Sequence, residues 1–500
     1  MLLNCHSWFS LHYGAMAPEK LLEELSARGY TRFVLTDINN TSAGIDFVRL
    51  STKYNVNPVL GIDFRNGIKQ KYVALAKNNE GFRALNEHLT DFLQNKKEFE
   101  NNAPELEDTF IIYPFKTKKY CSLNANEFIG IKPVELIKLP FSEWRKQLNK
   151  LVILQPATFR NKRDYNVHRL LRAIENNTLL SRLQISEQTS PDEMLVNKTE
   201  LLEAFQDYPE IIENTQKLLN ECSVEFEFKT NKNKQYFTQS HENDVKLLRS
   251  ECKKGLKYRF GKPSQKVLER MEKELNLIEK LGYSSYFLIN WDIVNYARSK
   301  GYYYVGRGSG ANSMVAYLLQ ITNVDPIELD LYFERFINPF RSNPPDFDID
   351  FSWTDRDDVT DYIFRKYGWK NTALLGTYIT FDHKSAFREI GKVFGLPPDE
   401  ITQLQKNPVP RENDQYAEWV VRYSKYISGM PSHLSIHASG ILISEKPINY
   451  YSATHILPKG FPTTHFDMQV AEDVGLYKFD ILSQRGLGKI KDALEIIKKN

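Results

Sequence analysis

Three aspartates alternate with large apolar residues in one short stretch, residues 345–351 (Pro-Asp-Phe-Asp-Ile-Asp-Phe). Residues two apart on a β-strand point to the same face, so we expect Asp346, Asp348 and Asp350 on one side of a strand and the apolar side chains in a core on the other. Neighbouring carboxylates repel one another. A divalent cation would remove that repulsion, and Mg²⁺ prefers carboxylates together with water and phosphate oxygens. The stretch therefore predicts the metal site of a phosphoryl-transfer enzyme.

A similar alternation of acids begins an EF-hand calcium loop, but that loop also requires glycine at its sixth position and glutamate at its twelfth. Those positions hold Phe351 and Asp357 here, and the residues between them suit a strand. An exposed strand with solvated carboxylates is the simpler alternative. A second motif upstream argues against it.

That second motif is a glycine-rich stretch at residues 306–313 (Gly-Arg-Gly-Ser-Gly-Ala-Asn-Ser), followed by an apolar, helix-like stretch at 314–319. Glycines let backbone N–H groups approach a phosphate, and a helix N-terminus would add positive potential. Ser309 offers a hydroxyl and Arg307 a charged fork. No Gly-Lys-Ser/Thr follows, so the stretch is not a P-loop. A tight turn is the alternative, but the acidic strand just downstream favours a phosphate-binding loop.

Several ordered motifs, these two among them, resemble those of the bacterial DNA polymerase III alpha family, the C-family replicative DNA polymerases. The resemblance extends over residues 1–500 and is densest over 275–390. It implies a palm similar to the polymerase-beta type of nucleotidyltransferase, in which a Gly-Ser turn and three aspartates form the active site. The motifs lie at residues 282–289 (Gly-Tyr-Ser-Ser-Tyr-Phe-Leu-Ile), 306–310, 333–339 (Phe-Glu-Arg-Phe-Ile-Asn-Pro), 345–351 and 478–480 (Lys-Phe-Asp).

Carried over residue by residue, the resemblance makes Asp346 and Asp348 the paired metal ligands and Asp480 the third carboxylate. The strand pattern alone does not choose between Asp346 with Asp348 and Asp348 with Asp350; the resemblance makes that choice. Two Mg²⁺ ions, with Mn²⁺ as an alternative, would bridge the aspartates and the incoming triphosphate and activate the primer 3′-hydroxyl. Residues 482–487 (Leu-Ser-Gln-Arg-Gly-Leu) differ from the family's Leu-Gly-Leu-Arg, which leaves the loop after the third aspartate open.

The same resemblance suggests which residues contact the phosphates of the nucleotide. Gly308 and Ser309 would hold the β- and γ-phosphates, with Arg307 beside them. Lys478 lies two residues before Asp480 and so on the same face of a strand. It would either neutralise charge in the transition state or form a simple salt bridge with the aspartate.

The N-terminal part alternates short apolar stretches typical of strands with a helical pattern, an order that favours βα units and a parallel sheet or barrel. This part resembles the PHP domain, a (βα)7-like barrel that is a metal-dependent phosphoesterase in its active members. A polar, acidic stretch at 94–109 is expected to be an inserted loop. The predicted strands are residues 32–36, 59–62, 72–76 and 151–154, and the predicted helix is residues 18–28.

Most of the His, Asp and Glu ligands of an active PHP site are missing from the chain. Asn4 and His6 stand where active members have His-x-His, and Asp37 lacks the histidine that normally follows it. Asp63 replaces a glutamate, and His168 is an isolated survivor. These residues cannot build a multinuclear site, so we expect the domain to be a structural platform. Binding of a single ion by His6 and Asp37 is the residual alternative.

Lys384, Arg388 and Lys392 recur every four residues, with a stripe of apolar residues opposite. An amphipathic helix with a basic face suits contact with a DNA backbone, although a solvated charged face is the common alternative. The family's helical thumb begins near this point, which favours DNA. Arg341, just before the aspartates, is a further candidate phosphate contact.

A polar run at residues 229–235 (Lys-Thr-Asn-Lys-Asn-Lys-Gln) marks the first predicted domain boundary. Family members continue into fingers, a sliding-clamp-binding segment and an OB-fold. The 500-residue chain is therefore expected to fold yet be nearly inactive alone. The predicted domains are 1–228 (PHP), 229–376 (first part of the palm), 377–434 (thumb) and 435–500 (second part of the palm and start of the fingers).

The composition fits a multidomain globular protein. A hydrophobic content of 41% and a charged content of 26% are ordinary, so a length of 500 residues implies several cores. The formal net charge of +3 is close to neutral, so DNA binding must rest on local basic surfaces. Four scattered cysteines without a Cys-x-x-Cys pair indicate reduced thiols in a cytoplasmic protein. Without a bilayer-length apolar run or a signal peptide, we expect neither membrane insertion nor secretion.

His433, His437 and His465 lack the compact spacing of a zinc site, and residues 437–440 (His-Ala-Ser-Gly) resemble a structural motif leading into a returning palm strand. The resemblance implies primer–template DNA and dNTPs as substrates. It also implies a sliding clamp, a clamp loader and a proofreading exonuclease subunit as partners. A PHP-type phosphoesterase and a catalytically dead DNA-binding or clamp-assembly platform are the alternatives, and the three retained aspartates argue against the latter.

Overall fold

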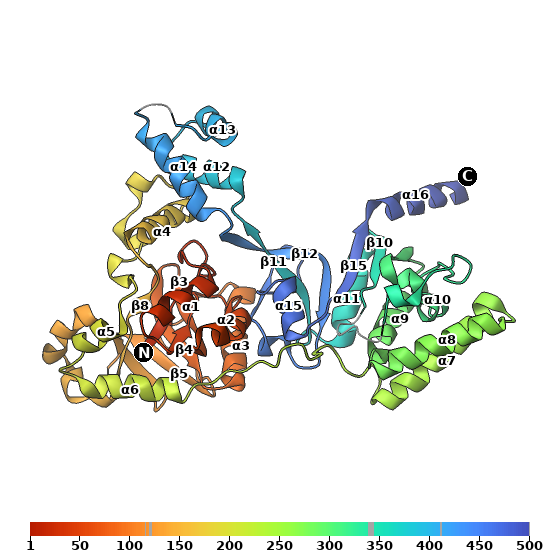
Figure 1. Ribbon diagram of the computed structural model, residues 1–500, viewed down its shortest axis with the longest axis horizontal. Coiled ribbons are helices and arrows are strands. Elements are labelled where there is room, and N and C mark those ends of the chain that lie inside the picture. Colours follow the sequence, from red (N-terminus) through yellow and green to blue (C-terminus); the bar gives the residue numbers. More distant parts are fainter. Residues whose placement is uncertain (116, 120–122, 339–344, 411–412, 500) are drawn as a thin grey trace. The chain divides into compact units, whose positions relative to one another are not determined.

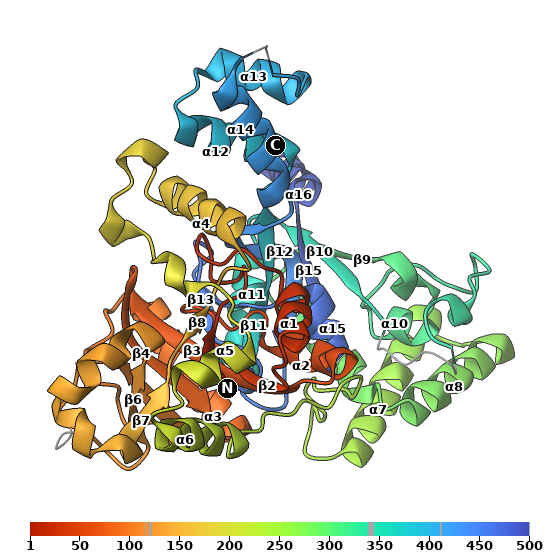
Figure 2. The ribbon, with the colours of Figure 1, turned by 60° about the vertical axis from the view of Figure 1, so that its left-hand side comes forward.

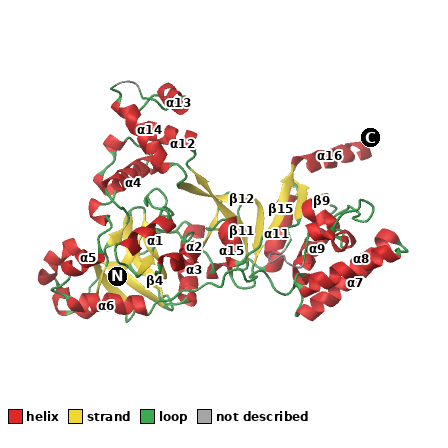
Figure 3. Ribbon diagram, in the orientation of Figure 1, coloured by secondary structure: helices red, strands yellow, loops and turns green. Residues whose placement is uncertain are grey.

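The computed structural model describes residues 1–115, 117–119, 123–338, 345–410 and 413–499 (Figures 1 and 3). The chain forms two compact units. The first comprises Met1–Phe226, Thr377–Ser435 and Asn449–Ile456, and the second comprises Glu227–Gly376, Ile436–Ile448 and Leu457–Asn500. The chain thus leaves the second unit after Gly376, contributes a helical segment to the first unit, and returns at Ile436. The identification of that segment as a thumb stays a prediction.

The first unit contains a sheet with strand order β7-β6-β5-β4-β3-β2-β1-β8. Its neighbours are parallel except at β3/β4 and β4/β5, which are antiparallel. The expectation of an all-parallel sheet was therefore wrong for these two pairs. A short turn around Gly67, at a φ of +59°, joins β3 directly to β4, and a connection that short can only pair strands antiparallel. The strands are β1 (Leu2–Cys5), β2 (Arg32–Leu35), β3 (Asn57–Asn66), β4 (Lys69–Ala76), β5 (Thr109–Pro114), β6 (Glu127–Ile131), β7 (Leu151–Ile153) and β8 (Pro156–Ala157).

Helices cover this sheet with apolar faces. In α1, Leu21, Leu22 and Leu25 are fully buried, and a proline in the first turn suits the helix start. The predicted helix at 18–28 is thereby confirmed. The helices of this part are α1 (Pro18–Ala27), α2 (Gly44–Ser51), α3 (Asn79–Asn95), α4 (Lys162–Glu175), α5 (Lys198–Ala204) and α6 (Pro209–Asn220), and the short strand β13 (Thr454–Ile456) also belongs to the unit.

The segment Thr377–Ser435 carries α12 (His383–Phe394), α13 (Pro398–Lys406) and α14 (Gln415–Ile427). These helices share an apolar cluster with α4, and α4, α12 and α14 are neighbours in two views (Figures 1 and 2). Phe387 and Ile390 of α12 are buried in it, which confirms the predicted amphipathic helix. Burial of this face leaves the basic face of α12 exposed.

The second unit is built on a sheet in which the strands follow the order β14-β11-β12-β15-β10-β9. β10 is parallel to β15 and antiparallel to β9, and β12 is antiparallel to β15. Two strands distant in sequence, β10 and β15, thus lie side by side in the interior of the sheet. The strands are β9 (Tyr304–Arg307), β10 (Asp348–Ser352), β11 (Thr372–Thr380), β12 (Pro431–Ile443), β14 (Pro462–Thr464) and β15 (Phe479–Gln484).

Helices supply the core against which these central strands rest. Ile349 and Phe351 of β10 are fully buried, as the period-two pattern predicted, and Ile481 of β15 is buried beside them. One helix of this unit, α8 (Gln265–Lys280), buries Val267, Met271, Leu275 and Ile278 on a single face. The helices are α7 (His241–Phe260), α8 (Gln265–Lys280), α9 (Ser284–Ser299), α10 (Met314–Leu318), α11 (Arg356–Tyr367), α15 (Met468–Val474) and α16 (Arg485–Lys499).

Within the described residues, no helix combines the length and apolar character that crossing a membrane would need. Cys5, Cys222 and Cys252 are buried free thiols, and burial raises the pKa of each above its usual value. The fourth cysteine, Cys121, lies outside the described residues.

Candidate active site

The pairing of strands in the second unit brings together the main residues singled out from the sequence. In the parallel pair β10/β15, Asp348 lies opposite Asp480, and in the antiparallel pair β10/β9 it lies opposite Arg307. Asp346 precedes the strand by two residues, so the expectation that all three alternating aspartates occupy the strand was wrong for this one. Pro345 has no N–H to give to a ladder, and the N–H of Phe347 donates to the Tyr286 hydroxyl (3.3 Å) rather than to a neighbouring strand.

Arg307 bridges two aspartates of β10. Its Nε donates to Asp350 Oδ2 (2.8 Å) and its Nη1 to Asp348 Oδ2 (3.2 Å). The Asp350 side chain is 9% exposed, whereas that of Asp348 is 31% exposed. The hydrogen bond that Arg307 donates to Asp350 raises the pKa of Arg307, so the guanidinium stays charged. The buried carboxylate of Asp350 is therefore paired with the partly exposed Arg307, and Asp348 keeps an open side.

Asp480 is held by two side chains. The Ser439 hydroxyl donates to Oδ1 (2.6 Å), and Lys478 forms an ion pair with Oδ2. Burial by itself would lower the pKa of Lys478, but the hydrogen bond and the charge of Asp480, together with the more distant Asp346 and Asp348, raise it. The predicted placement of Lys478 beside Asp480 is confirmed by this ion pair.

The carboxylates influence one another electrostatically. Burial raises the pKa of Asp348, and the negative charges of Asp480 and Asp346 add to the rise, while Arg307 and Lys478 oppose it. Burial also raises the pKa of Glu472 in α15, with Asp346 as the next cause. The site is thus a concentration of negative charge that a cation would stabilise.

Tyr286 in α9 lies between the two aspartate-bearing segments. Its ring stacks on Phe347 (centroids 5.8 Å apart, planes at 12°) and on Phe479 (4.9 Å, 29°). These two phenylalanines are the sequence neighbours of Asp348 and Asp480. The stack fixes both strands through apolar contacts behind the carboxylates.

The Gly-Ser loop approaches the same aspartates. Residues Gly308–Asn312 form a 3₁₀ turn directly after β9. Gly308 has a φ of +75°, and a Cβ there would come within 3.0 Å of Asp348 Oδ2. A Cβ at Gly310 would come within 2.6 Å of the Phe347 ring. The glycines are needed because the loop backbone rests against the aspartate strand.

The expectation that a helix N-terminus would face a phosphate was wrong. The helix after the loop, α10, is short, and the N–H groups of Met314 and Val315 donate to the buried Glu274 carboxylate (3.0 and 3.1 Å). The Ser313 hydroxyl accepts from Ala316 N (3.1 Å). The positive end of α10 is therefore already neutralised from inside the protein.

His437 accepts the Gly440 N–H at Nδ1 (3.0 Å), and Gly440 pairs with Asp480 across β12 and β15. This arrangement agrees with the interpretation of residues 437–440 as a structural motif. Across the ranges that the structure describes, no group of three or more His, Cys, Asp or Glu side chains is arranged to hold a metal ion.

The aspartates fit Mg²⁺ in the chemistry of their donors, since hard carboxylate oxygens are the ligands this ion prefers. In their arrangement they are instead paired with basic side chains, Asp348 with Arg307 and Asp480 with Lys478. Binding of a cation would require these ion pairs to open. The site thus has suitable ligands, whose negative charge is partly neutralised by Arg307 and Lys478.

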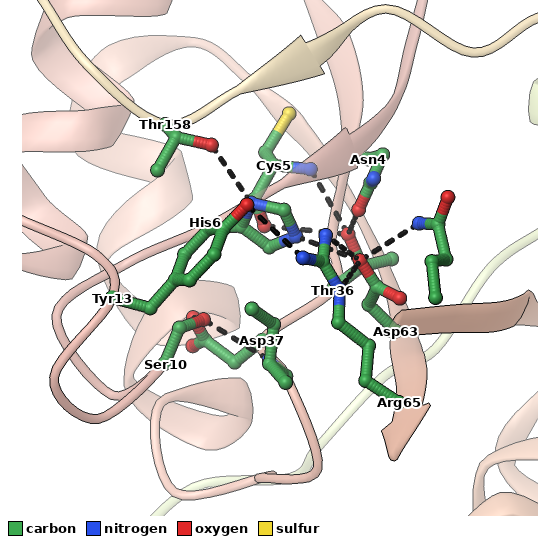
Figure 4. Close-up of polar contacts among 12 residues, drawn as sticks. Asn4, Cys5, His6, Ser10, Tyr13, Thr36, Asp37, Asp63, Arg65 and Thr158 are labelled. Atoms are coloured by element: carbon green, nitrogen blue, oxygen red, sulfur yellow. Dashed lines mark hydrogen bonds and ion pairs between the residues drawn. The ribbon is translucent and has the colours of Figure 1, made fainter. Parts of the chain in front are cut away.

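The degenerate PHP site holds an arginine among its remaining polar residues (Figure 4). Arg65 donates to Asp63 Oδ2 through Nη2 (2.7 Å) and Nε (3.0 Å), and His6 Nε2 contacts the same oxygen (3.0 Å). Burial alone would raise the pKa of Asp63, but the charge of Arg65 and the contact with His6 lower it. Arg65 was missed in the sequence, although a basic residue two positions after Asp63 on a strand was a usable signal.

The other two predicted residues of this site, Asp37 and Asn4, also accept hydrogen bonds. Asp37 accepts the Ser7 N–H, the Ser7 hydroxyl and the Ser10 hydroxyl, each at 2.7 Å, and burial raises its pKa. Asn4 Oδ1 accepts from the Thr36 hydroxyl (2.8 Å). The polar residues of the degenerate site are thus built into a hydrogen-bond network.

His168 also lies inside the first unit, where its two ring nitrogens are engaged. Nδ1 contacts the carbonyl oxygen of Tyr13 (2.9 Å), and Nε2 accepts the Thr189 N–H (3.1 Å). Burial lowers its pKa to about 4. His168 is thus a neutral structural histidine with both nitrogens used.

The predicted DNA contacts form the exposed face of α12. Arg388 and Lys392 both contact Glu389, at 2.9 and 3.4 Å. Lys384, Arg388 and Lys392 belong to the first unit, whereas the aspartates belong to the second. Arg341 lies outside the described residues.

Comparison with known proteins finds two family models that match the chain. Residues 246–483 match the family model described as "Bacterial DNA polymerase III alpha NTPase domain", and residues 3–122 match the PHP domain. The protein therefore combines a PHP domain with a nucleotidyltransferase-like polymerase domain. It belongs to the bacterial DNA polymerase III alpha family.

Named relatives match over nearly the whole chain. DNA polymerase III subunit alpha of Bacillus subtilis (strain 168) is 30% identical over 99% of this chain and 49% of the relative. The same subunit of Buchnera aphidicola subsp. Schizaphis graminum is 29% identical over 100% of this chain and 49% of the relative. An error-prone DNA polymerase of Symbiobacterium thermophilum is 27% identical over 99% of this chain and 52% of the relative. The chain spans about half the length of the curated relatives it matches.

Proposed function

We propose that this chain carries the nucleotidyltransferase site of a template-directed DNA polymerase, the catalytic alpha subunit of a bacterial replicase. The reaction would join a dNTP to a primer 3′-hydroxyl and release diphosphate. The observation that carries the proposal is the register of β10 with β15, which sets Asp348 opposite Asp480 beside the Gly308–Asn312 loop.

Asp346, Asp348 and Asp480 would hold Mg²⁺. When bound, the metal supplies charge neutralisation at the triphosphate and a lower pKa for the primer hydroxyl. Arg307 and Lys478 are charged at neutral pH, because contacts with aspartates raise both pKa values. They would move from the aspartates to the phosphates.

Gly308 and Ser309 would contribute backbone and hydroxyl contacts to the β- and γ-phosphates. The backbone of Gly308 comes close to Asp348, so a phosphate held by the loop would lie near this carboxylate. Because Glu274 neutralises the end of α10, phosphate charge would be balanced by side chains and loop N–H groups instead.

In the same proposal the second unit is the palm, and α12–α14 form a thumb whose residues Lys384, Arg388 and Lys392 contact the DNA backbone. The first unit would be a PHP domain of the (βα)7 type that acts as a platform. Primer–template DNA and dNTPs would be the substrates, and the protein would act in the cytoplasm. A sliding clamp, a clamp loader and a proofreading exonuclease subunit would be partners of the whole protein, by family resemblance.

A phosphoesterase activity of the PHP domain is disfavoured by Arg65. The guanidinium contacts the carboxylate of Asp63 that a metal would need, and its positive charge opposes a cation there. His6, the other surviving residue nearby, contacts the same oxygen.

The test is Mg²⁺-dependent primer extension by the full-length protein, as wild type and as Asp348→Asn, with primer–template affinity measured separately. Loss of extension with retained DNA binding supports the proposal. Asp361→Asn is the control, because it removes a carboxylate from an exposed ion pair with Arg365 in the same unit. Equal extension by wild type and Asp348→Asn would place the catalytic carboxylates elsewhere. DNA binding without extension by either would favour the inactive platform.

A further inference from the structure

Helix α8 places a buried carboxylate, paired with an arginine, on the face that packs into the core. Glu274 has no exposed surface, and it lies on the face of α8 that buries Met271 and Leu275. Arg270, one turn earlier, donates to Glu274 Oε1 through Nε (2.6 Å). Burial raises the pKa of Glu274, while Arg270 and two backbone N–H groups oppose the rise. A buried carboxylate is costly unless it is fully paired, so its partners indicate what it does.

Those partners are the residues that directly follow the Gly-Ser loop. Glu274 Oε2 accepts from the Ser313 hydroxyl (2.8 Å) and from Val315 N (3.1 Å), and Oε1 accepts from Met314 N (3.0 Å). With Arg270, the carboxylate therefore has four donors. Charge-assisted bonds of this kind are short and directional, so they fix the backbone at the point where the loop ends.

Arg270 fixes the loop itself. Its Nη2 donates to the carbonyl oxygens of Asn312 (3.0 Å) and Leu331 (3.0 Å). Asn312 in turn donates through Nδ2 to the carbonyl of Ser309 (2.9 Å). A chain of hydrogen bonds thus runs from α8 to the serine expected at the phosphates.

The loop is also held from its other side. The backbone at Gly310 lies against the ring of Phe347, the residue between Asp346 and Asp348. Movement of the loop away from α8 would press it into this ring, because the space for even one methyl group is absent. The loop is therefore packed between α8 behind it and the aspartate segment in front.

We propose that Glu274 and Arg270 are positioning residues for nucleotide binding, which clamp the Gly308–Asn312 loop so that Ser309 meets the triphosphate. The inference rests on the proposed polymerase function of the same site. Neither side chain contacts the nucleotide. Their contribution is to keep the loop ordered before binding, so that the nucleotide does not have to order it.

The test compares Glu274→Gln and Arg270→Lys with the wild type, each in the full-length protein. Glutamine keeps the shape of Glu274 but loses its charge and offers an NH₂ group where only acceptors fit. Lysine keeps the charge of Arg270 but lacks the fork that reaches two carbonyls. Glu272→Gln is the matched control, because Glu272 lies on the same helix in an exposed pair with Arg249 (2.8 Å).

Two quantities are measured for each protein, both with Mg²⁺ and primer–template present. The first is the Kd of a non-hydrolysable dNTP, and the second is the rate of backbone hydrogen exchange in residues 308–318 without nucleotide. We expect the Kd to rise about tenfold in Glu274→Gln and Arg270→Lys. Exchange in the loop should accelerate in both, with primer–template affinity unchanged, and the control should match the wild type.

The possible results distinguish failure of the positioning role of Glu274 and Arg270 from failure of the proposed polymerase function. Faster loop exchange with an unchanged dNTP Kd would mean that the clamp is merely structural, and it would overturn the positioning role. Unchanged exchange in Arg270→Lys, the milder variant, would overturn the clamp itself. A wild type that binds no dNTP, while its loop still loosens in the variants, would refute the proposed function and leave the clamp standing as a structural device.

Discussion

The buried pair of Arg65 and Asp63 gives the sharpest test of the first unit. In Arg65→Met the bulk of the side chain is largely kept, but Asp63 loses two hydrogen bonds and a charge partner at 2.7 Å. Both side chains are at most 5% exposed, so water cannot replace the lost partner. Removing one member of a buried pair costs about 3–5 kcal/mol. We expect the free energy of unfolding of the first unit to fall by that amount.

The remaining contacts of Asp63 offset only part of the lost free energy of unfolding. Gln70 Nε2 (2.9 Å) and His6 Nε2 (3.0 Å) still face its Oδ2. Arg65 also lies over the Tyr13 ring (4.8 Å) and donates to its hydroxyl (3.0 Å), so a second contact is lost with it. The measurement is urea unfolding followed by hydrogen exchange in peptides of β3 and β4, which report on this unit separately.

The double variant Arg65→Met/Asp63→Asn supplies the control. It removes both charges, so it should be more stable than Arg65→Met alone, with a coupling energy of about 2 kcal/mol or more. A loss below about 1 kcal/mol in Arg65→Met, or additive losses in the double variant, would refute the reasoning. Since the pair lowers the pKa of Asp63, its stabilisation is present above the unfolded pKa of about 3.9 and is lost as pH falls below it. The double variant should lack that acid-side loss.

Two further predictions concern single residues. Gly308→Ala should abolish most primer extension, because a Cβ would crowd Asp348. The control is Gly301→Ala, which has a similar φ of +71° and nothing within 4 Å of the added Cβ, and which should lose about 1–2 kcal/mol of stability without losing activity. Equal activity in the two variants would contradict the close approach of Gly308 to Asp348. Because burial lowers the pKa of His168 to about 4, the folded state binds fewer protons than the unfolded state, and stability should fall by about 2 kcal/mol between pH 7 and pH 5. That fall should be absent from His168→Gln in urea titrations at the two pH values, and an identical pH dependence would contradict the assignment.

Some of this site was predictable because it depends on short-range periodicity. The alternation at 345–351 placed Ile349 and Phe351 in the core, and the two-residue spacing placed Lys478 beside Asp480. Asp346 was misplaced because the strand begins only at Asp348. A proline and a hydrogen bond to a distant tyrosine decide that start, and the tyrosine's position depends on tertiary packing.

Long-range partners were beyond the reach of sequence patterns. Glu274 and Arg65 occupy positions that periodicity assigns to a core or a strand face, and only the folded chain shows which groups they neutralise. The antiparallel β3/β4 pair was missed because alternating elements were taken to mean crossovers. The packing of Thr377–Ser435 with the first unit depends on an apolar cluster assembled from distant segments.

The ring of Tyr286 stacks on two phenylalanines that lie in different aspartate-bearing segments. It touches the neighbours of Asp348 and of Asp480 at once, so any change in its size or tilt shifts both carboxylates together. The separation of these two charges sets how strongly they repel and how much they gain from a cation. Tyr286, which contacts no substrate, thus helps to set the distance between the carboxylates of Asp348 and Asp480. Substitutions that shift α9, the helix that carries Tyr286, would change that distance and with it the affinity of the site for a cation.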